Sequence, residues 1–274
     1  MRQYDQIDWN RMWSLARKNK GSGKKRSAAS WDARADSFRQ RTHRSVYIEK
    51  FLHLLQPQPG WRVLDMGCGP GTLALPLAKV VRRVTAVDFS SRMLALLREE
   101  ASRRKIGNIS AVQASWEDDW RKRSITVHDV VIASRSLSVA DLQAALEKAT
   151  AFAGELVVIT DRVRHGPLDP DAFAAVGRPM KLGPDYIYTL NLLYQMGIEA
   201  RVDFIRLDET QSYASLDKAV EGFLWMFREE LKTQEREALA AYVRSIARRS
   251  SRGDWEIRRR RPPVWAYISW QPRE

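Results

Sequence analysis

The stretch Val63-Leu64-Asp65-Met66-Gly67-Cys68-Gly69-Pro70-Gly71 decides the fold. An apolar strand that ends in an acidic residue leads directly into three closely spaced glycines, and a helix is expected from about Gly71 to Val80. Glycine adopts positive φ and has no side chain to hold a ligand away from the backbone. The first turn of a helix adds unpaired N–H groups and the positive end of the helix dipole. The stretch therefore predicts a backbone-lined ligand site at the carboxyl end of a first strand.

Short apolar runs alternate with helical patterns on both sides of this turn. The expected strands are residues 62–65, 83–88, 109–113, 129–133, 155–160, 199–207 and 264–270. The expected helices between them are residues 90–104, 140–151 and 186–196. Strands that alternate with helices imply right-handed crossovers and a mostly parallel sheet covered on both faces. The sequence predicts an α/β fold with a doubly wound, seven-stranded, mostly parallel sheet.

Two further segments flank this pattern. Residues 1–56 contain an amphipathic helical piece and a second helix over 31–55, so we expect a helical cap there. Residues 208–262 contain helical patterns at 216–227 and 234–248 and are too long for a hairpin loop, which indicates a helical insertion. The expected division is a cap at 1–56, a core at 57–207, the insertion at 208–262 and the last strand of the core at 263–274.

The central motif has a recognisable family context. Asp-Met-Gly-Cys-Gly-Pro-Gly after an apolar strand resembles motif I of the class I S-adenosylmethionine-dependent methyltransferases. The second strand ends in Asp88, 23 positions after Asp65, and the Ser90-Ser91-Arg92-Met93-Leu94 segment resembles the helix start that follows in the family. The resemblance implies a Rossmann-like methyltransferase fold, S-adenosylmethionine as cofactor and S-adenosylhomocysteine as product. It assigns cofactor binding to Asp65, Gly67, Cys68, Gly69, Gly71, Asp88, Phe89, Met93, Ser115, Trp116 and Ser134.

Two features of the motif qualify this interpretation. Dinucleotide-binding folds also hold a ligand with a Gly-rich strand–turn–helix, but their spacing is Gly-x-Gly-x-x-Gly, and Pro70 would hamper the pyrophosphate turn. After the third strand, Ser115 stands where the family often has an acidic residue near the adenine amino group. A serine hydroxyl can still reach that amine, and Trp116 could pack on the adenine. A carboxylate such as Asp88 can accept both ribose hydroxyls.

The flanks resemble a narrower group. Trp31-Asp32-Ala33-Arg34-Ala35 is similar to a segment found before motif I in many bacterial small-molecule methyltransferases, where this helix helps to cover the cofactor. Residues 183–188 and 192–197 resemble a bacterial subgroup as well.

Methyl transfer is an in-line displacement at a sulfonium carbon, so the enzyme mainly aligns the acceptor and sometimes removes a proton. The loop after the fourth strand, Ser134–Ser136, lacks the Asn/Asp-Pro-Pro-Tyr motif of exocyclic-amine DNA and RNA enzymes. Cys68 is the single cysteine, so covalent carbon-5 pyrimidine chemistry, an internal disulfide and a cysteine-based zinc cluster are all disfavoured, and we expect no metal site. Arg135 could clamp a carboxylate or phosphate, and a tyrosine or His165 could act as base. The candidates for acceptor contact and catalysis are Arg135, His165, Tyr186, Tyr188, Asn191 and Tyr194.

The chain is strongly basic. It carries a net charge of +13, the first 50 residues hold 13 Lys/Arg against 5 acids, and Arg258–Arg261 forms a second basic run. Basic segments of this kind are either solvated surface or attract an anionic partner. The sequence lacks a secretory signal and a membrane-spanning apolar stretch, so we expect a cytoplasmic protein that does not bind membranes. The oligomeric state stays open between a monomer and a homodimer.

Three functions remain open. The first is methyl transfer to O, N or C of a small molecule, with the cap and insertion excluding water. The second is RNA or ribosome methylation through the basic segments, because neutralised phosphates supply affinity without sequence preference. The third is a non-catalytic cofactor-binding protein, since a fold alone does not determine function.

Overall fold

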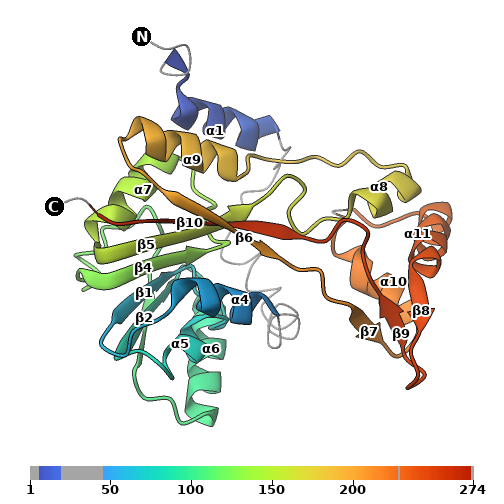
Figure 1. Cartoon of the computed structure of the whole chain (residues 1–274), viewed down its shortest axis with the longest axis horizontal. Helices are drawn as coiled ribbons and strands as arrows, with labels where there is room; N and C mark the ends of the chain where they lie inside the picture. Colours follow the sequence, from blue (N-terminus) through green and yellow to red (C-terminus); the bar gives the residue numbers. More distant parts are fainter. Residues whose placement is uncertain (1–5, 20–45, 228, 273–274) are drawn as a thin grey trace. The chain divides into compact units, whose positions relative to one another are not determined.

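The computed structural model describes residues 6–19, 46–227 and 229–272 (Figure 1). The predicted helix over 31–55 is therefore described only as α4 (Val46–Leu55), and the Trp31–Ala35 segment and most of the N-terminal basic residues lie outside this part. The chain forms two compact units. Unit 1 comprises residues 1–161, 183–205 and 266–274, and unit 2 comprises residues 162–182 and 206–265.

The main sheet has seven strands in the order β3-β2-β1-β4-β5-β10-β6. Their bounds are β1 (Arg62–Met66), β2 (Arg83–Asp88), β3 (Ile109–Gln113), β4 (His128–Ser134), β5 (Ala153–Arg162), β6 (Arg201–Arg206) and β10 (Val264–Trp270). The pairs β1–β2, β2–β3, β1–β4 and β4–β5 are parallel. The predicted seven-stranded, mostly parallel sheet is confirmed.

Burial explains why the central strands are apolar throughout. In β1, every residue after Arg62 is buried, and Val63 and Leu64 are fully so, because helices cover both faces of a parallel sheet. The strand order reverses at β1, whose neighbours β2 and β4 lead to opposite sides of the sheet. The carboxyl ends of strands at such a reversal leave a crevice for ligands. The predicted glycine turn lies at this point.

Six helices are described in unit 1: α1 (Trp9–Asn19), α4 (Val46–Leu55), α5 (Ala74–Leu77), α6 (Ser91–Arg103), α7 (Leu142–Ala151) and α9 (Tyr186–Gln195). Helix α5 is much shorter than the helix predicted from Gly71 to Val80. Gly71 has φ +91°, which is not helical, and Pro76 has no N–H to donate within the helix. The chain therefore passes through turns on both sides of a single helical turn.

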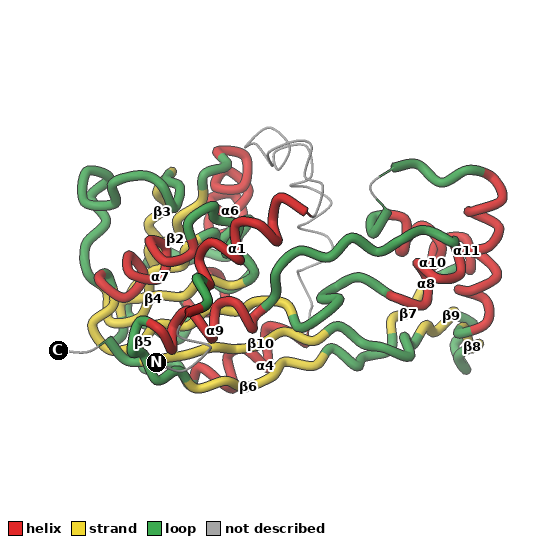
Figure 2. Tube along the Cα trace, turned by 90° about the horizontal axis from the view of Figure 1, so that it is seen from above, coloured by secondary structure: helices red, strands yellow, loops and turns green. Residues whose placement is uncertain are grey.

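Helix α1 packs beside α7 and α9 (Figure 2). The Trp13 side chain is buried and its indole N–H donates to the carbonyl of Val139 at 2.9 Å. The side-chain oxygen of Asn10 accepts hydrogen bonds from the N–H groups of Leu142 and Gln143, the first residues of α7. Since the first N–H groups of a helix have no partner within it, Asn10 caps α7 from a segment 132 positions before Leu142.

Unit 2 has its own core. It contains α8 (Pro170–Val176), β7 (Gln211–Tyr213), α10 (Leu216–Leu224), α11 (Thr233–Ser245), β8 (Ala247–Arg249) and β9 (Trp255–Ile257). The strands form an antiparallel sheet in the order β7-β9-β8. The segment predicted as a helical insertion therefore holds a small sheet as well as helices. Strands of three residues are too short for alternation of polar and apolar residues to reveal them.

Residues 162–182 belong to unit 2 because α8 packs against α11. The carboxylate of Asp169 is fully buried, caps α8 by accepting from Asp171 N and Ala172 N, and accepts from the hydroxyl of Tyr242 in α11 at 3.0 Å. Unit 2 is thus a discontinuous unit, which differs from the predicted boundaries at 207 and 262. No helix in the described parts of the chain is both long and apolar enough to cross a membrane.

Candidate active site

The glycine turn after β1 has the backbone that the sequence predicts. Gly67, Gly69 and Gly71 have φ values of +75°, +56° and +91°, which side chains other than glycine rarely adopt. A Cβ atom added to Gly67 would overlap the Cβ of Ser136, and one added to Gly71 would overlap the Leu97 side chain. The turn is therefore a close-packed cradle in which glycine is required on grounds of both conformation and space.

Asp88 fastens this turn to the end of β2. One carboxylate oxygen of Asp88 accepts from the N–H of Gly69 and the other from the N–H of Ser90, each at 2.9 Å. The N–H groups of Gly67 and Cys68 also donate to the carbonyl of Val87. Asp88 therefore holds the turn in shape through both of its carboxylate oxygens.

Asp65 has an unsatisfied oxygen. Its side chain is 2% exposed, and its Oδ2 atom has no hydrogen-bond partner among the described residues. Burial, and next the nearby charge of Asp88, raise the pKa of the Asp65 carboxyl to about 7. Buried polar atoms are rarely left without a partner in a finished site. A cationic ligand with N–H donors would satisfy this oxygen, and S-adenosylmethionine carries both a sulfonium and an ammonium group.

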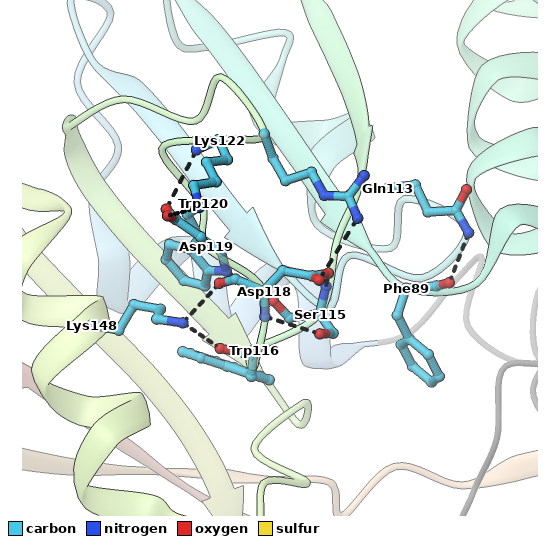
Figure 3. A network of polar contacts seen from close by, with 10 residues as sticks. Phe89, Gln113, Ser115, Trp116, Asp118, Asp119, Trp120, Lys122 and Lys148 are labelled. Atoms are coloured by element: carbon cyan, nitrogen blue, oxygen red, sulfur yellow. Dashed lines mark hydrogen bonds and ion pairs between the residues drawn. The ribbon is translucent and has the colours of Figure 1, made fainter.

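The loop after β3 is held by its own side chains (Figure 3). The N–H of Ser115 donates to Asp118 Oδ2 at 2.8 Å, and the N–H of Asp118 donates back to the Ser115 hydroxyl at 3.3 Å. Lys148 of α7 donates to the carbonyls of Trp116 and Asp118 at 2.6 and 2.9 Å. The N–H of Ser115 lowers the pKa of the Asp118 carboxyl. These contacts fix the loop before any ligand arrives.

Several residues that the sequence assigns to cofactor binding have contacts within the protein in this structure. The Ser115 hydroxyl already accepts a bond within the loop, and the Trp116 indole donates to the carbonyl of Ser136 at 3.3 Å. The Phe89 ring points away from the polar network in Figure 3, and its carbonyl accepts from Gln113. Met93 and Cys68 are buried, at 2% and 5% exposure, and act as packing residues in this structure.

A second polar group lies at the ends of β4 and β5. The hydroxyl of Tyr47, from α4, lies 2.6 Å from Ser134 Oγ and 2.7 Å from Thr160 Oγ1. The Tyr47 side chain is fully buried, which raises the pKa of its phenol. Local sequence patterns do not reveal Tyr47 and Thr160 as site residues, since Tyr47 lies at helical spacing with the core residue Phe51 and Thr160 lies inside an apolar strand.

Arg135 and Ser136 follow β4 directly. The guanidinium of Arg135 lies 4.1 Å from the centroid of the Tyr47 ring. The Ser136 hydroxyl donates to the carbonyl of Met66 at 2.6 Å. The loop that carries Arg135 is therefore attached to the glycine turn, and the polar group of β4 and β5 adjoins the cradle of β1.

The other predicted acceptor residues do not gather here. Tyr188 packs edge-on against Trp9 and Trp13 of α1, whereas Tyr186 packs against Phe204. The Asn191 amide donates to a carbonyl of its own helix, and Tyr194 is 54% exposed. His165 belongs to unit 2, where its Nδ1 atom lies 3.0 Å from the carbonyl of Leu168. Of the six candidates, Arg135 is the one that lies with Ser134 at the sheet edge.

Comparison with known proteins agrees with this geometry. Residues 63–153 match the family model of a methyltransferase domain. An uncharacterized protein of Haemophilus influenzae is 37% identical over 202 residues, which cover 72% of this chain and 73% of that protein. The YcgJ protein of Bacillus subtilis has a similar fold, with a TM-score of 0.54 at 13% identity over 83% of this chain and 98% of that one.

A shorter match involves enzymes that act on ribosomal RNA. The 23S rRNA (uracil(1939)-C(5))-methyltransferase RlmD of Acidithiobacillus ferrooxidans is 39% identical over 57 residues, or 21% of this chain and 13% of that protein. The chain thus spans only a small part of that relative.

The chain belongs to the class I S-adenosylmethionine-dependent methyltransferases. It is an enzyme, and S-adenosylmethionine is its cofactor. The cofactor and fold predicted from the glycine turn are confirmed. The residues that contact the cofactor and the identity of the acceptor remain proposals.

Proposed function

We propose that the enzyme transfers the methyl group of S-adenosylmethionine to O, N or C of a small molecule bound at the ends of β4 and β5. The observation that carries this proposal is the compact polar group there, in which Tyr47, Ser134 and Thr160 share hydrogen bonds next to the glycine turn. Small-molecule sites place a few fixed polar groups among apolar side chains. The buried Tyr47 ring and its two hydroxyl partners fit that description.

The cofactor would be held by the glycine cradle and the residues around it. Gly67, Gly69 and Gly71 provide backbone space, Asp65 offers its unpaired oxygen to the positive charge, and Asp88 accepts ribose hydroxyls. The adenine end would lie against the residues that follow β2 and β3, namely Phe89, Ser115 and Trp116. When bound, the cofactor supplies an electrophilic methyl carbon, and the protein supplies alignment of the acceptor.

The protonation state of Tyr47 limits the part that this residue can take in the reaction. Burial raises the pKa of its phenol, and its hydroxyl forms hydrogen bonds with the hydroxyls of Ser134 and Thr160. A phenol in this state is a weak base at neutral pH, because an efficient general base has a pKa near the working pH. We therefore infer that Tyr47 is not the general base of the reaction.

Label transfer tests the proposal. The purified enzyme and S-adenosylmethionine labelled in its methyl group are incubated with an ultrafiltered metabolite extract and, separately, with total RNA. We expect label in the small-molecule fraction of the first reaction, and expect Gly67→Ala to abolish it. Label that enters RNA alone would contradict the proposal.

RNA is a second candidate acceptor because of one surface feature. Exposed arginines are concentrated in residues 244–261 of unit 2: Arg244, Arg248, Arg249, Arg252, Arg258, Arg260 and Arg261. Guanidinium groups bind phosphates with a rigid fork of donors. The partial match to a 23S rRNA methyltransferase is consistent with such a partner.

Salt dependence decides whether this surface binds RNA. If it does, the affinity for a labelled single-stranded RNA falls steeply as the salt concentration rises. Changing Arg248, Arg258 and Arg260 together to Gln should then make the slope of log affinity against log salt concentration shallower by about two to three. Fluorescence anisotropy measures both quantities. If the protein does not bind RNA at low salt, RNA is excluded as the acceptor.

A further inference from the structure

A cavity borders the two outer strands β10 and β6 of the main sheet (Figure 1). Its volume is about 560 Å³, and all of its lining residues belong to unit 1. Leu54 of α4, Leu156 of β5 and Ile198 form an apolar part of the lining. Leu156 pairs with Val130 near the start of β4, whereas the glycine turn follows the end of β1. This β6–β10 cavity is therefore not part of the proposed cofactor site.

The tyrosine of the cavity, Tyr267 of β10, has an unpaired hydroxyl. Its side chain is 3% exposed, and its ring packs edge-on against Phe51 of α4, with ring centroids 5.4 Å apart. The hydroxyl forms no hydrogen bond within the described part of the chain. The fully enclosed polar side-chain atoms without a partner in that part are Asp65 Oδ2 and Thr72 Oγ1. The Tyr267 oxygen is not one of them, so it reaches open space, and the cavity that Tyr267 lines supplies this space.

The charged residues of the lining leave an excess of negative charge. Asp203 of β6 pairs with Arg201 through its Oδ2 atom, which lies 2.8 Å from the arginine Nε. Glu199, just before β6, also lines the cavity and has no ion-pair partner in the described residues. Two carboxylates therefore face one guanidinium, in a chain whose net charge is +13. Such a local reversal of sign favours a cationic ligand.

The surroundings of the Tyr267 hydroxyl show the same preference. Burial raises the pKa of its phenol most, and the charge of Asp203 raises that pKa further, whereas Arg201 lowers it by less. The phenol is thus protonated at neutral pH, and the negative end of the ion pair acts on it more strongly than the positive end. A phenol oxygen accepts hydrogen bonds as well as donating one, so a donor cation can bind to it.

We propose that the β6–β10 cavity binds an organic primary amine in its ammonium form. The ammonium donates to the Tyr267 oxygen and to the carboxylate of Asp203, because an ammonium has three N–H donors and no acceptor. The carbon part of the amine packs on Leu54 and Leu156. Small-molecule sites combine a few fixed polar groups with apolar walls in this way. This site does not depend on the proposed function, since its residues differ from those proposed for the cofactor and the methyl acceptor.

Three probes that share a benzene ring test the choice of ligand. Benzylamine, benzyl alcohol and benzoate are titrated separately at neutral pH into the full chain labelled with ¹⁵N, and the backbone amide signals of Tyr267 and Ser269 are followed by NMR. We expect benzylamine to move both signals saturably, with a dissociation constant of about 1 mM. Benzyl alcohol should bind at least about tenfold more weakly, because it lacks the charge. Benzoate should not move the signals.

Variants of the polar residues test the contacts. Tyr267→Phe keeps the ring against Phe51 and should weaken benzylamine binding about tenfold, since it removes one hydrogen bond to a charged group. Tyr213→Phe is the matched control, because it removes a tyrosine hydroxyl in unit 2, and it should leave the affinity within about twofold.

The ion pair provides a test with opposite signs. Asp203→Asn should weaken benzylamine binding about tenfold, whereas Arg201→Gln should strengthen it about threefold by releasing Asp203. The Arg201 side chain is 76% exposed, so its replacement does not threaten the fold. The proposal is wrong if benzylamine leaves both amide signals unmoved, if benzyl alcohol or benzoate binds as tightly as benzylamine, or if Arg201→Gln weakens the binding.

Discussion

The two halves of the sheet edge in unit 1 are built in different ways. At the ends of β1, β2 and β3, the site consists of backbone: glycines with positive φ, and N–H groups held by Asp88 and Asp118. At the ends of β4 and β5, it consists of side chains, with Tyr47 and Thr160 meeting from positions 113 residues apart. The half that we propose for the cofactor is held by contacts between residues close in sequence, whereas the half that we propose for the acceptor depends on tertiary packing.

This difference has a functional meaning. A backbone cradle suits a cofactor that is the same throughout a family, because few sequences can form the turn. A side-chain cluster can change with the acceptor while the sheet stays intact. Positive φ falls on glycines after β1, where it costs little, and on Arg135 after β4, where it is strained.

The largest expected effect on cofactor affinity comes from filling the glycine cradle. Gly67→Ala and Gly177→Ala both place a side chain at positive φ, with φ +75° and +73° in the wild type. A Cβ at Gly67 would overlap Ser136, whereas nothing lies within 4 Å of one at Gly177. Gly177→Ala should lose about 1 kcal/mol of stability from its backbone conformation alone, and Gly67→Ala should lose more because of the overlap. Only Gly67→Ala should lose cofactor affinity, by about a hundredfold in calorimetry. An equal affinity in the two variants would show that the cradle is not the cofactor site.

The largest expected effect on the free energy of unfolding concerns the charge of Asp65. Its folded pKa of about 7 lies above the ordinary aspartate value of 3.8, so the cofactor-free protein loses stability as the pH rises from about 4 to about 7. Asp65→Asn removes this dependence. The variant should match the wild type near pH 4 and exceed it near pH 8, by up to about 4 kcal/mol. Urea unfolding at a series of pH values measures the difference, and a difference that does not change with pH would contradict the account.

A smaller effect tests the strain in the acceptor half. Arg135→Gly and Arg135→Ala both remove the stacking on Tyr47, but only glycine accepts φ +56° without cost. The Gly variant should therefore be more stable than the Ala variant by about 1 kcal/mol. Arg82 does not have positive φ, so the same pair of changes there should favour Ala. Thermal unfolding of the four variants provides the comparison, and the same order at both positions would argue against strain at Arg135.

The smallest effect concerns the loop after β3. Asp118→Ala removes the acceptor of the Ser115 N–H and frees the loop. Cofactor affinity should fall a few fold, since one hydrogen bond contributes about 1 kcal/mol. Asp119→Ala is the matched control, because Asp119 is a neighbouring acid that accepts from Arg121 and Lys122 and not from Ser115. Calorimetric titration with S-adenosylhomocysteine compares the two, and equal losses would contradict the role given to Asp118.

The comparison also explains what the sequence could predict. The strands of the main sheet and the glycine turn follow from local patterns, and the last strand was predicted at its observed bounds, 264–270. The role of Asp118 could have been found from its position three residues after Ser115, a spacing typical of side chains that cap turns. Tyr47 could not be found in this way, because its partners come from β4 and β5 and its helical spacing is that of a core residue.

In unit 2, too, features that depend on short strands or distant contacts could not be predicted from the sequence. Helices α10 and α11 were predicted from their apolar periodicity, but the small sheet was missed, because each of its strands has three residues. The membership of residues 162–182 in this unit depends on Asp169 bonding to Tyr242, 73 positions away. Neither feature produces a local pattern.

The central claim is that the glycine turn and Asp88 form the S-adenosylmethionine site. Calorimetric titration of the wild type and Asp88→Ala with S-adenosylmethionine, S-adenosylhomocysteine and NAD tests it most directly. We predict that the first two bind the wild type, that NAD does not, and that Asp88→Ala weakens binding at least about tenfold, since it releases Gly69 and Ser90. Binding of NAD, or unchanged affinity in Asp88→Ala, would contradict the account.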